Sequence, residues 1–475
     1  MTGAEARVST SSTGGTGDFW WGAATASYQV EGAVDEDGRG PSIWDTFSAE
    51  PGRIADGSSG AVACDSYHRW REDLDLLSGL GANAYRFSIA WPRVQPTGSG
   101  QVNAAGLAYY DRLVDGLLAR GIAPFATLFH WDLPQPLQDA GGWMVRDTAQ
   151  RFAEYAAVIA EALGDRVAAW GTLNEPFVHM ALGYAFGSHA PGETLLLDAF
   201  AAGHHQLLGH GLATQALRAG SRQGSTGGWG STGGWGSTGG QGSTGSPPVM
   251  LVNNLTPVRA ASPSTEDAAA AAVYDAFHNR MFLDTVLRGT YPDELADAAE
   301  RVVHDGDLAT IAQPLDLLGV NYYNPTLVRA PGPDNPLPFE LVPIEGYPLT
   351  GFGWPVVPEG LTDLLTGLRQ TYGEALPPVV VTENGCSYPD EPGPDGTVDD
   401  AARIAYLDSH IAAVGAAREA GVDVRGYLAW SLLDNFEWAE GYTQRFGITR
   451  VDFATGERTP KASYEWFRER IARGW

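Results

Sequence analysis

The sequence is short of cysteine and of basic residues, and each shortage excludes a class of protein. Only two cysteines, Cys64 and Cys386, occur in 475 residues, so disulfides cannot provide the framework of the fold. Lysine and arginine number 30 against 57 aspartates and glutamates, which gives a formal net charge of −27. Such a charge repels the phosphates of nucleic acids and anionic lipid surfaces. We therefore expect neither a nucleic acid nor a membrane as a partner.

Long apolar runs are also missing. No segment is long and apolar enough to span a bilayer, and Met1 to Asp18 lack the apolar stretch of a secretory signal. Residues 1–17 are rich in Ser, Thr and Gly, which predicts a disordered tail. With no signal and two thiols that are expected to be buried and reduced, the sequence predicts a cytoplasmic protein.

The sequence does contain the material for a large core, since hydrophobic residues make up 44% of it and charged residues 18%. Eight apolar, β-prone runs alternate with segments of helical period. This alternation predicts an α/β fold, a single (β/α)8 TIM barrel over residues 18–475 with elaborated loops at the C-terminal rim. The runs are Phe19 to Thr25, Ala84 to Ile89, Ala123 to Phe129, Val167 to Leu173, Val249 to Leu255, Leu317 to Tyr322, Val379 to Thr382 and Gly426 to Trp430.

The helix between the third and fourth runs is the best marked. Asp147 is expected to cap it, with Gln150 three residues further on, and Gly164 is expected to end it. The predicted buried face consists of Phe152, Ala156, Ile159 and Leu163.

Polar residues stand where the predicted strands end. In an eight-fold barrel the working groups lie on the C-terminal rim, because packed side chains fill the interior. An ordinary turn would explain any one such site, but six converging sites predict an active site at this rim. The strand ends are His130 with Trp131, Asn174 with Glu175, Asn254, Asn321 with Tyr323, Glu383 with Asn384, and Trp430 with Ser431.

Two of these residues are glutamates in matching positions, Glu175 in TLNEP and Glu383 in VTENG. Hydrolysis of a glycoside needs one carboxyl group to protonate the leaving oxygen and a second to attack the anomeric carbon or to activate water. The alternative is that both glutamates are ion-pair residues of the rim. Groups suited to a hydroxyl-rich ring, either hydrogen-bonding or flat and apolar, accompany them: Gln29, His130, Asn174, Trp430, Glu437 and Trp438.

Seven blocks carry a family resemblance: FWWGAATASYQVEG from residue 19, YRFSIAW from 85, TLFHWDLP from 127, TLNEP from 172, Asn321 to Tyr323, TENG from 382 and WSLLDNFEW from 430. On these blocks the chain resembles glycoside hydrolase family 1, the β-glucosidase family, from Phe19 to the C-terminus. The resemblance implies a retaining double displacement with Glu175 as acid/base and Glu383 as nucleophile. It further implies small β-glucosides and cello-oligosaccharides as substrates, with no metal and no cofactor.

The resemblance also implies a sugar site. Arg86 and Tyr323 are expected to bond Glu383 and to hold its pKa down, whereas burial and the charge of Glu383 are expected to raise the pKa of Glu175. Trp354 resembles the family's platform for the leaving group. The implied glycone-binding residues are Gln29, His130, Asn174, Tyr323, Trp430, Glu437 and Trp438.

The same residues bear on other activities. A 6-phospho-β-glycosidase needs positive charge near the sugar's 6-position, which Glu437 disfavours. A non-catalytic glycan-binding protein is disfavoured because both glutamates are intact. Transfer to acceptors other than water uses the same covalent intermediate and stays open, as do glucose against galactose or fucose and the oligomeric state. Three histidines lack metal-ligand spacing and are expected to be packing or surface residues: His204, His205 and His210.

One segment stands apart, a six-residue repeat of Gly, Ser and Thr from Gly224 to Gly245 that contains Trp229 and Trp235. Its composition predicts a flexible insert at 224–246, and the strand, lysine and helix start of a phosphate loop are missing around it. Because it follows a helix and precedes the fifth strand, it is predicted on the N-terminal face, opposite both glutamates. The alternative is that its tryptophans stack on a polysaccharide.

Overall fold

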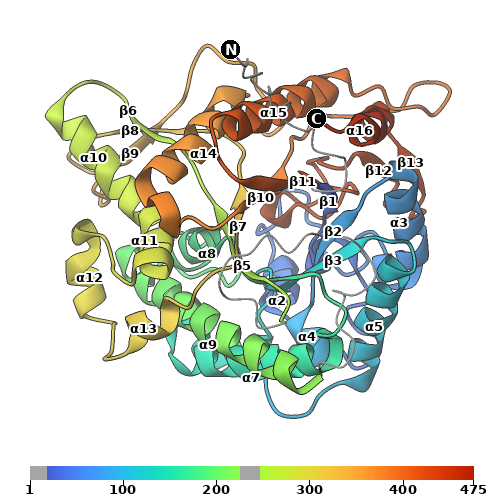
Figure 1. The fold of residues 1–475 in the computed structure, drawn as a ribbon, viewed down its shortest axis with the longest axis horizontal. Helices are drawn as coiled ribbons and strands as arrows, with labels where there is room; N and C mark the ends of the chain where they lie inside the picture. The colour runs from blue at the N-terminus through green and yellow to red at the C-terminus, as the bar shows by residue number, and fades with distance from the viewer. Residues whose placement is uncertain (1–18, 225–245) are drawn as a thin grey trace, which may run out of the picture.

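The computed structural model describes residues 19–224 and 246–475 and contains a closed barrel of eight parallel strands surrounded by helices (Figure 1). The strand order around the barrel is β1-β11-β10-β7-β5-β4-β3-β2, so the first strand closes against the last. The (β/α)8 prediction is confirmed. The strands are β1 Trp20–Ala24, β2 Ala84–Ser88, β3 Ala123–Phe129, β4 Ala169–Asn174, β5 Val249–Asn254, β7 Leu317–Asn321, β10 Val379–Asn384 and β11 Val424–Trp430.

A principal helix follows each strand: α3 Ser66–Leu80, α5 Ala104–Leu118, α7 Asp147–Leu163, α9 Phe200–Gly224, α11 Met281–Arg288, α14 Pro358–Tyr372, α15 Ala401–Glu419 and α16 Ala462–Arg473. Further α-helices lie in the loops: α1 Ser27–Val30, α2 Ile43–Ala49, α4 Trp91–Val94, α6 Gln135–Asp139, α8 Pro176–Val178, α10 Thr265–Asp275, α12 Ala296–Glu300 and α13 Asp307–Ile311. Two π-helical turns follow α8 and α10, η2 His179–Ala185 and η4 Ala276–Arg280.

The loops also carry two small sheets that the sequence did not predict. One is three-stranded, with β6 Val258–Ala260, β8 Thr326–Arg329 and β9 Glu340–Val342, and the other pairs β12 Thr449–Val451 with β13 Arg458–Pro460. Their strands have three or four residues each, too few for a periodic pattern to stand out in the sequence.

Helix α7 confirms the predicted helix but not its predicted cap. Gly164 ends it as expected, and the predicted face is buried. The N-cap, however, is Arg146, with no side-chain cap, and Asp147 is the first helical residue. The Asp147 carboxylate instead pairs with Arg151 one turn on, at 3.0 Å.

The inside of the barrel changes from apolar to polar along the strands. Nine buried apolar side chains form a cluster of their own at the N-terminal end: Ala84, Ala123, Phe125, Ala169, Met250, Val252, Leu317, Val380 and Leu428. Because inward positions recur every second residue, Ala84 is followed by Arg86 and Phe125 by Thr127. The apolar layer thus forms a floor, and polar groups gather above it at the C-terminal end.

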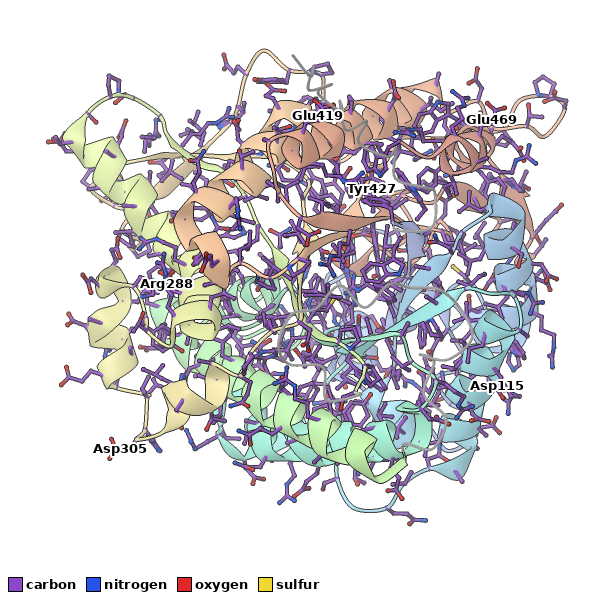
Figure 2. All side chains as sticks on the ribbon, in the orientation of Figure 1. Asp115, Arg288, Asp305, Glu419, Tyr427 and Glu469 are labelled. Atoms are coloured by element: carbon purple, nitrogen blue, oxygen red, sulfur yellow. The ribbon has the colours of Figure 1, made fainter. Side chains whose placement is uncertain are left out.

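Figure 2 labels five exposed charged residues, Asp115, Arg288, Asp305, Glu419 and Glu469, and the buried Tyr427. Among the described residues, no helix combines the length and apolar character needed to cross a membrane.

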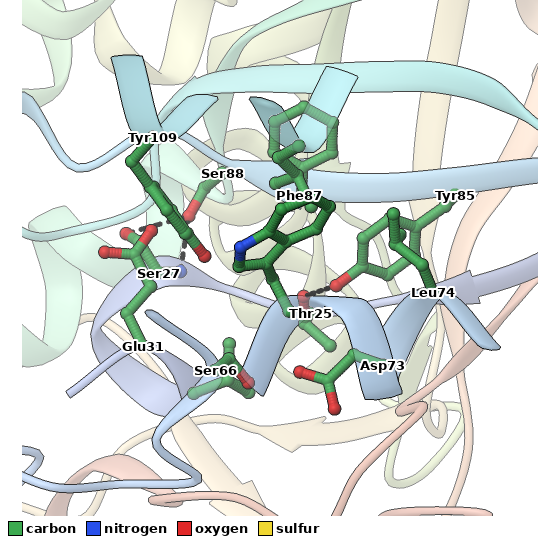
Figure 3. Close-up of a pocket in the computed structure, with 13 residues that line it drawn as sticks. Thr25, Ser27, Glu31, Ser66, Asp73, Leu74, Tyr85, Phe87, Ser88 and Tyr109 are labelled. Atoms are coloured by element: carbon green, nitrogen blue, oxygen red, sulfur yellow. Dashed lines mark hydrogen bonds between the residues drawn. The ribbon is translucent and has the colours of Figure 1, made fainter. Parts of the chain in front are cut away.

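A small cavity lies between α1, β2, α3 and α5 (Figure 3). Its volume is about 20 Å³, and its lining includes the carboxylates of Glu31 and Asp73. The Tyr85 hydroxyl closes one side through a 2.5 Å hydrogen bond with Thr25. A space of this size suits one water molecule and cannot take a sugar ring.

The predicted tail and the predicted repeat insert lie outside the described residues. Helix α9 ends at Gly224 and β5 begins at Val249, so the insert joins a helix to the N-terminal end of a strand. Glu175 follows β4 at the opposite end of the barrel.

We expect replacement of residues 225–245 by a four-residue linker to leave kcat/KM within about twofold, because the flanking ends lie opposite Glu175. Loop closure changes only slowly with length, so the unfolding temperature should change by no more than about 4 °C. Steady-state kinetics and a thermal melt check this. The control keeps the full insert and replaces Trp229 and Trp235 with alanine, and a tenfold rise in KM in either variant would contradict the prediction.

Candidate active site

Two glutamates lie buried at the barrel rim, Glu175 directly after β4 and Glu383 within β10. The backbone shapes both positions. Glu175 has φ 46°, a left-handed conformation that is strained for a residue with a side chain, and Pro176 starts α8 immediately after it. The pairing of β10 with β7 shifts register between Val381 and Glu383, and such an irregularity redirects the side chains that follow.

Arg86 connects Glu383 to the neighbouring strands. Its Nη1 lies 2.5 Å from Oε1 of Glu383, and its Nη2 donates to Oδ1 of Asn174 at 2.7 Å. Its Nε donates to the Thr127 hydroxyl at 3.0 Å. The other oxygen of Glu383 accepts a 2.9 Å hydrogen bond from the Tyr323 hydroxyl. A cation and a phenol therefore hold both oxygens of this carboxylate.

Amides rather than a cation surround Glu175. Its Oε1 accepts from Asn321 at 2.8 Å and from Asn254 at 3.4 Å. Burial, and next the charge of Glu383, raise the pKa of Glu175 to about 8. The hydrogen bond from Asn321 opposes this rise, and the charge of Arg86 opposes it less strongly than that bond does. The Arg86 guanidinium bonds Glu383 directly. The predicted raised pKa is confirmed.

The prediction that the pKa of Glu383 is held below its ordinary value is wrong. Burial raises the pKa of this carboxyl, and Arg86 and Tyr323 limit the rise without reversing it. Glu383 is still the more readily ionised of the two acids, because it has the direct ion pair with Arg86 and Glu175 does not. The shared proton therefore resides on Glu175, and Glu383 carries the charge.

Some polar side chains beside the carboxylates have hydrogen-bonding atoms without a partner. Nε2 of Gln29 donates to Oδ1 of Asn435 at 3.0 Å and faces Oε2 of Glu437 at 3.3 Å. Nε2 of His130 lies 2.9 Å from Nδ2 of Asn174. Within the described part of the chain, Oε1 of Gln29 and Nδ1 of His130 are buried without a partner. A polar ligand can satisfy buried groups of this kind, and sugar hydroxyls can both donate and accept.

Aromatic rings form the apolar side of the site. His130 stacks on Trp430 and on Trp438, with ring centroids 6.0 and 5.8 Å apart. Trp354, predicted as the leaving-group platform, packs against Tyr323 at 5.2 Å and against Phe352 at 4.3 Å. Flat faces beside amides and carboxylates suit a pyranose ring, which has apolar faces and a polar edge.

Glu437 is the third acid of the site and is half-buried. Burial and the charges of Glu383 and Glu175 raise its pKa to about 8, while the bond from Gln29 lowers it. The loop that carries Glu437 is anchored by buried charges. Lys461 bonds Asp434 at 2.7 Å and Asp390 at 2.6 Å, so the loop is fixed three residues before Glu437.

The structure gives the predicted site residues one connected set of contacts, and their individual roles stay predictions. The three histidines without metal-ligand spacing lie elsewhere: His204 bonds Asp307, His205 faces the carbonyl of Trp143, and His210 bonds Thr172. All three are buried packing residues. Across residues 19–224 and 246–475, no group of three His, Cys, Asp or Glu side chains is placed to hold a metal ion.

Comparison with known proteins decides the family. A sequence profile described as "Glycosyl hydrolase family 1" matches residues 15–474, nearly the whole chain. The chain belongs to glycosyl hydrolase family 1. The family 1 resemblance of the sequence blocks is thereby confirmed, and the protein is a glycoside hydrolase.

Family 1 relatives are similar over almost their full length. "Thermostable beta-glucosidase B" of Thermobispora bispora is 47% identical, covering 96% of this chain and 90% of that protein. "Bifunctional beta-D-glucosidase/beta-D-fucosidase" of Bifidobacterium breve is 46% identical, covering 96% and 97%. The solved structure of a family 1 β-glucosidase from Thermotoga maritima superposes with a TM-score of 0.87 at 41% identity, covering 96% and 97%.

Sequence reasoning missed part of this family 1 site. Asn254 and Asn321 stood out as strand ends, but nothing in the pattern made them the hydrogen-bond donors to Glu175. Asn435, which bonds Gln29, lies within a matched block yet carries no signal of its own. His278 gave no signal either, because it lies in a helical segment and reaches the site only through the tertiary fold.

The raised pKa of Glu175 predicts a pH profile. The carboxyl is protonated below about 8 and loses its proton above it, so kcat/KM is expected to fall as pH rises through about 8. Initial rates on an alkyl β-glucoside, whose leaving group needs the proton of Glu175, measured between pH 4 and pH 10 check this. Glu175→Gln should lose this basic limb, because its amide does not titrate.

Glu437 has a similar pKa, so Glu437→Gln is the matched control and should keep the limb. If the limb survived unchanged in Glu175→Gln and vanished in Glu437→Gln, Glu437 would be the titrating group and the assignment to Glu175 would be lost.

Proposed function

We propose that this family 1 enzyme is a retaining β-glucosidase that removes terminal, non-reducing β-D-glucosyl residues from small β-glucosides and cello-oligosaccharides. One observation carries the proposal: two buried carboxyl groups share a rim, one held by a cation and a phenol, the other by amides that leave it protonated. A charged nucleophile and a neutral acid are what double displacement needs at the same time.

In the first step an oxygen of Glu383 attacks the anomeric carbon, and a bond forms between them. The glycosidic C–O bond breaks, and its oxygen takes the proton of Glu175, so the aglycone leaves as an alcohol. Arg86 and Tyr323 keep Glu383 ionised and aligned until attack. The product is a glycosyl ester of Glu383 and an ionised Glu175.

In the second step water attacks the anomeric carbon and gives a proton to Glu175. The ester bond breaks, and Glu383 regains its negative charge. The pKa of Glu175 changes in the right direction for both steps. While Glu383 is esterified it carries no charge, the repulsion that raised the pKa of Glu175 is gone, and Glu175 stays ionised to serve as base.

The glycone is bound by the predicted set, with Gln29 and Glu437 at the outer hydroxyls, His130 and Asn174 nearer the anomeric carbon, and Tyr323 beside the nucleophile. Trp430 and Trp438 supply apolar faces. The partnerless Oε1 of Gln29 and Nδ1 of His130 support this placement, because sugar hydroxyls would satisfy both. Trp354, half-buried next to Tyr323, is the platform for the leaving group.

We further propose a role late in cellulose breakdown, where short β-linked oligosaccharides are converted to glucose. A cytoplasmic location is supported by Cys64 and Cys386, which are buried free thiols. The proposed architecture is a single catalytic domain from residue 18 onward. The relative from Bifidobacterium breve, named for both glucosidase and fucosidase activity, supports testing an aryl β-D-fucoside beside the glucoside.

The proposed roles predict opposite responses to the leaving group. Glu383→Ala should abolish turnover of every β-glucoside, because no other group forms the covalent intermediate. Glu175→Ala should still release dinitrophenol, which needs no proton. Its kcat/KM for alkyl glucosides should fall by roughly 10²- to 10⁴-fold. Burst kinetics and the anomer first formed, followed by NMR, check both the roles and retention. Equal losses on both substrates in Glu175→Ala, or inversion, would contradict the assignment.

The proposed place of Glu437 predicts discrimination against phosphate. We expect cellobiose to be hydrolysed and its 6-phosphate to be refused, because the negative charge of Glu383 acts at the place of Glu437 and would repel a phosphate dianion there. Glu437→Ser should weaken the transition state for cellobiose by about 1–3 kcal/mol through lost hydrogen bonds. Comparable kcat/KM for the two sugars in the unmodified enzyme would show that the 6-hydroxyl of the bound glycone does not lie beside Glu437.

A further inference from the structure

A chain of hydrogen bonds leads from Glu175 away from the sugar site into a π-helical turn. Nδ2 of Asn254, at the end of β5, donates to Oε1 of Glu175 at 3.4 Å. Nε2 of His278, in the turn η4, lies 3.0 Å from Oδ1 of Asn254. Nδ1 of His278 lies 2.9 Å from the hydroxyl of Tyr274, one turn earlier. Nothing in the proposed mechanism uses His278 or Tyr274.

The direction of this chain follows from one contact that cannot be reversed. Nε2 of His278 also lies 3.2 Å from the backbone carbonyl oxygen of Asn254, and a carbonyl can only accept. Nε2 therefore carries the hydrogen, and Nδ1 accepts from Tyr274. A donor at Nε2 requires the oxygen of the Asn254 amide beside it, so the amide's NH₂ group is turned toward Glu175.

The orientation of Asn254 determines where Glu175 can carry its proton. Oε1 of Glu175 faces two N–H donors, from Asn254 and from Asn321. A proton on Oε1 would face these donors, so the proton resides on Oε2. The Asn321 amide is itself oriented, because its oxygen accepts from the Thr382 hydroxyl at 2.7 Å.

Packing keeps His278 in place. The ring of Phe177, two residues after Glu175, stacks on the imidazole with centroids 3.9 Å apart and planes at 26°. Only 6% of His278 and 7% of Tyr274 is exposed. Burial lowers the pKa of His278 to about 3, so the ring stays neutral and keeps a single tautomer throughout the working pH range.

We propose that His278 is a positioning residue for the general acid: by orienting Asn254 it places the proton of Glu175 on Oε2. The inference rests on the proposed function of Glu175. Without a donor at position 278, the Asn254 amide is free to turn its oxygen toward Glu175. A proton on Oε1 would then bond that oxygen, and the leaving group would lose its acid.

His278→Phe tests this, because it keeps a flat ring against Phe177 and removes both nitrogens. We expect kcat/KM to fall roughly tenfold for an alkyl β-glucoside and to change less than about threefold for the dinitrophenyl glucoside, since only the former needs the proton. The basic limb of the pH profile should move to higher pH, because an amide oxygen beside Glu175 disfavours the ionised form. The groups that face Glu175, namely Arg86, Asn321, Tyr323, Glu383 and Glu437, remain unaltered in this variant.

Two variants separate positioning from a general loss of structure. His278→Gln places an amide N–H where Nε2 lies and should restore most of the alkyl glucoside activity. Tyr274→Phe removes the outer hydroxyl alone and should change either substrate less than about threefold, because the Asn254 carbonyl still requires the hydrogen on Nε2. If His278→Phe does not fold, Asn254→Ala tests the same step directly, with the same dependence on leaving group expected.

Equal losses on both glucosides, with the basic limb unmoved, would overturn the inference. So would a failure of His278→Gln to recover more activity than a folded His278→Phe. Failure of the proposed function looks different: the unmodified enzyme would then release neither aglycone, or Glu175→Ala would show no dependence on the leaving group.

Discussion

The ion pair between Arg86 and Glu383 is the interaction on which the rest of the site depends. Both side chains are almost fully buried, and the removal of one partner of such a pair leaves an uncompensated charge at a cost of about 3–5 kcal/mol. Arg86 also bonds Thr127 and Asn174, so one guanidinium links β2, β3, β4 and β10 at the level where the apolar floor ends. The sugar-facing groups are arranged around this fixed cation.

The pair also explains how two glutamates in one pocket come to differ. Both are buried, and burial raises both pKa values. The difference lies in what each oxygen meets, a cation and a phenol for Glu383 and amides for Glu175. Strained backbone accompanies this difference: Glu175, Trp131 and Trp438 all have positive φ, which the surrounding packing must hold in place.

The barrel and most of its rim could be predicted because the relevant signals are local. Each strand is a short apolar run, and each polar side chain follows its run directly, so the order of residues along the chain suffices to assign Glu175 and Glu383 to one rim. Signals that depend on the tertiary fold were out of reach. The pKa of Glu383 depends on the full extent of burial, and the contact between His278 and Asn254 depends on two segments that meet only in space.

Closure of the barrel between its first and last strands has a consequence for how the protein is made. β1 pairs with β11, and Gln29, just after β1, bonds Asn435 and faces Glu437, just after β11. These contacts span more than four hundred residues, so no ribosome-bound fragment that lacks the last strand can assemble the sugar site. Until then β1 can pair only with β2, and the edge of β1 that faces β11 in the closed barrel has no partner strand. The barrel can therefore close only after β11 has been translated, so its closure is a late step in the folding of this enzyme.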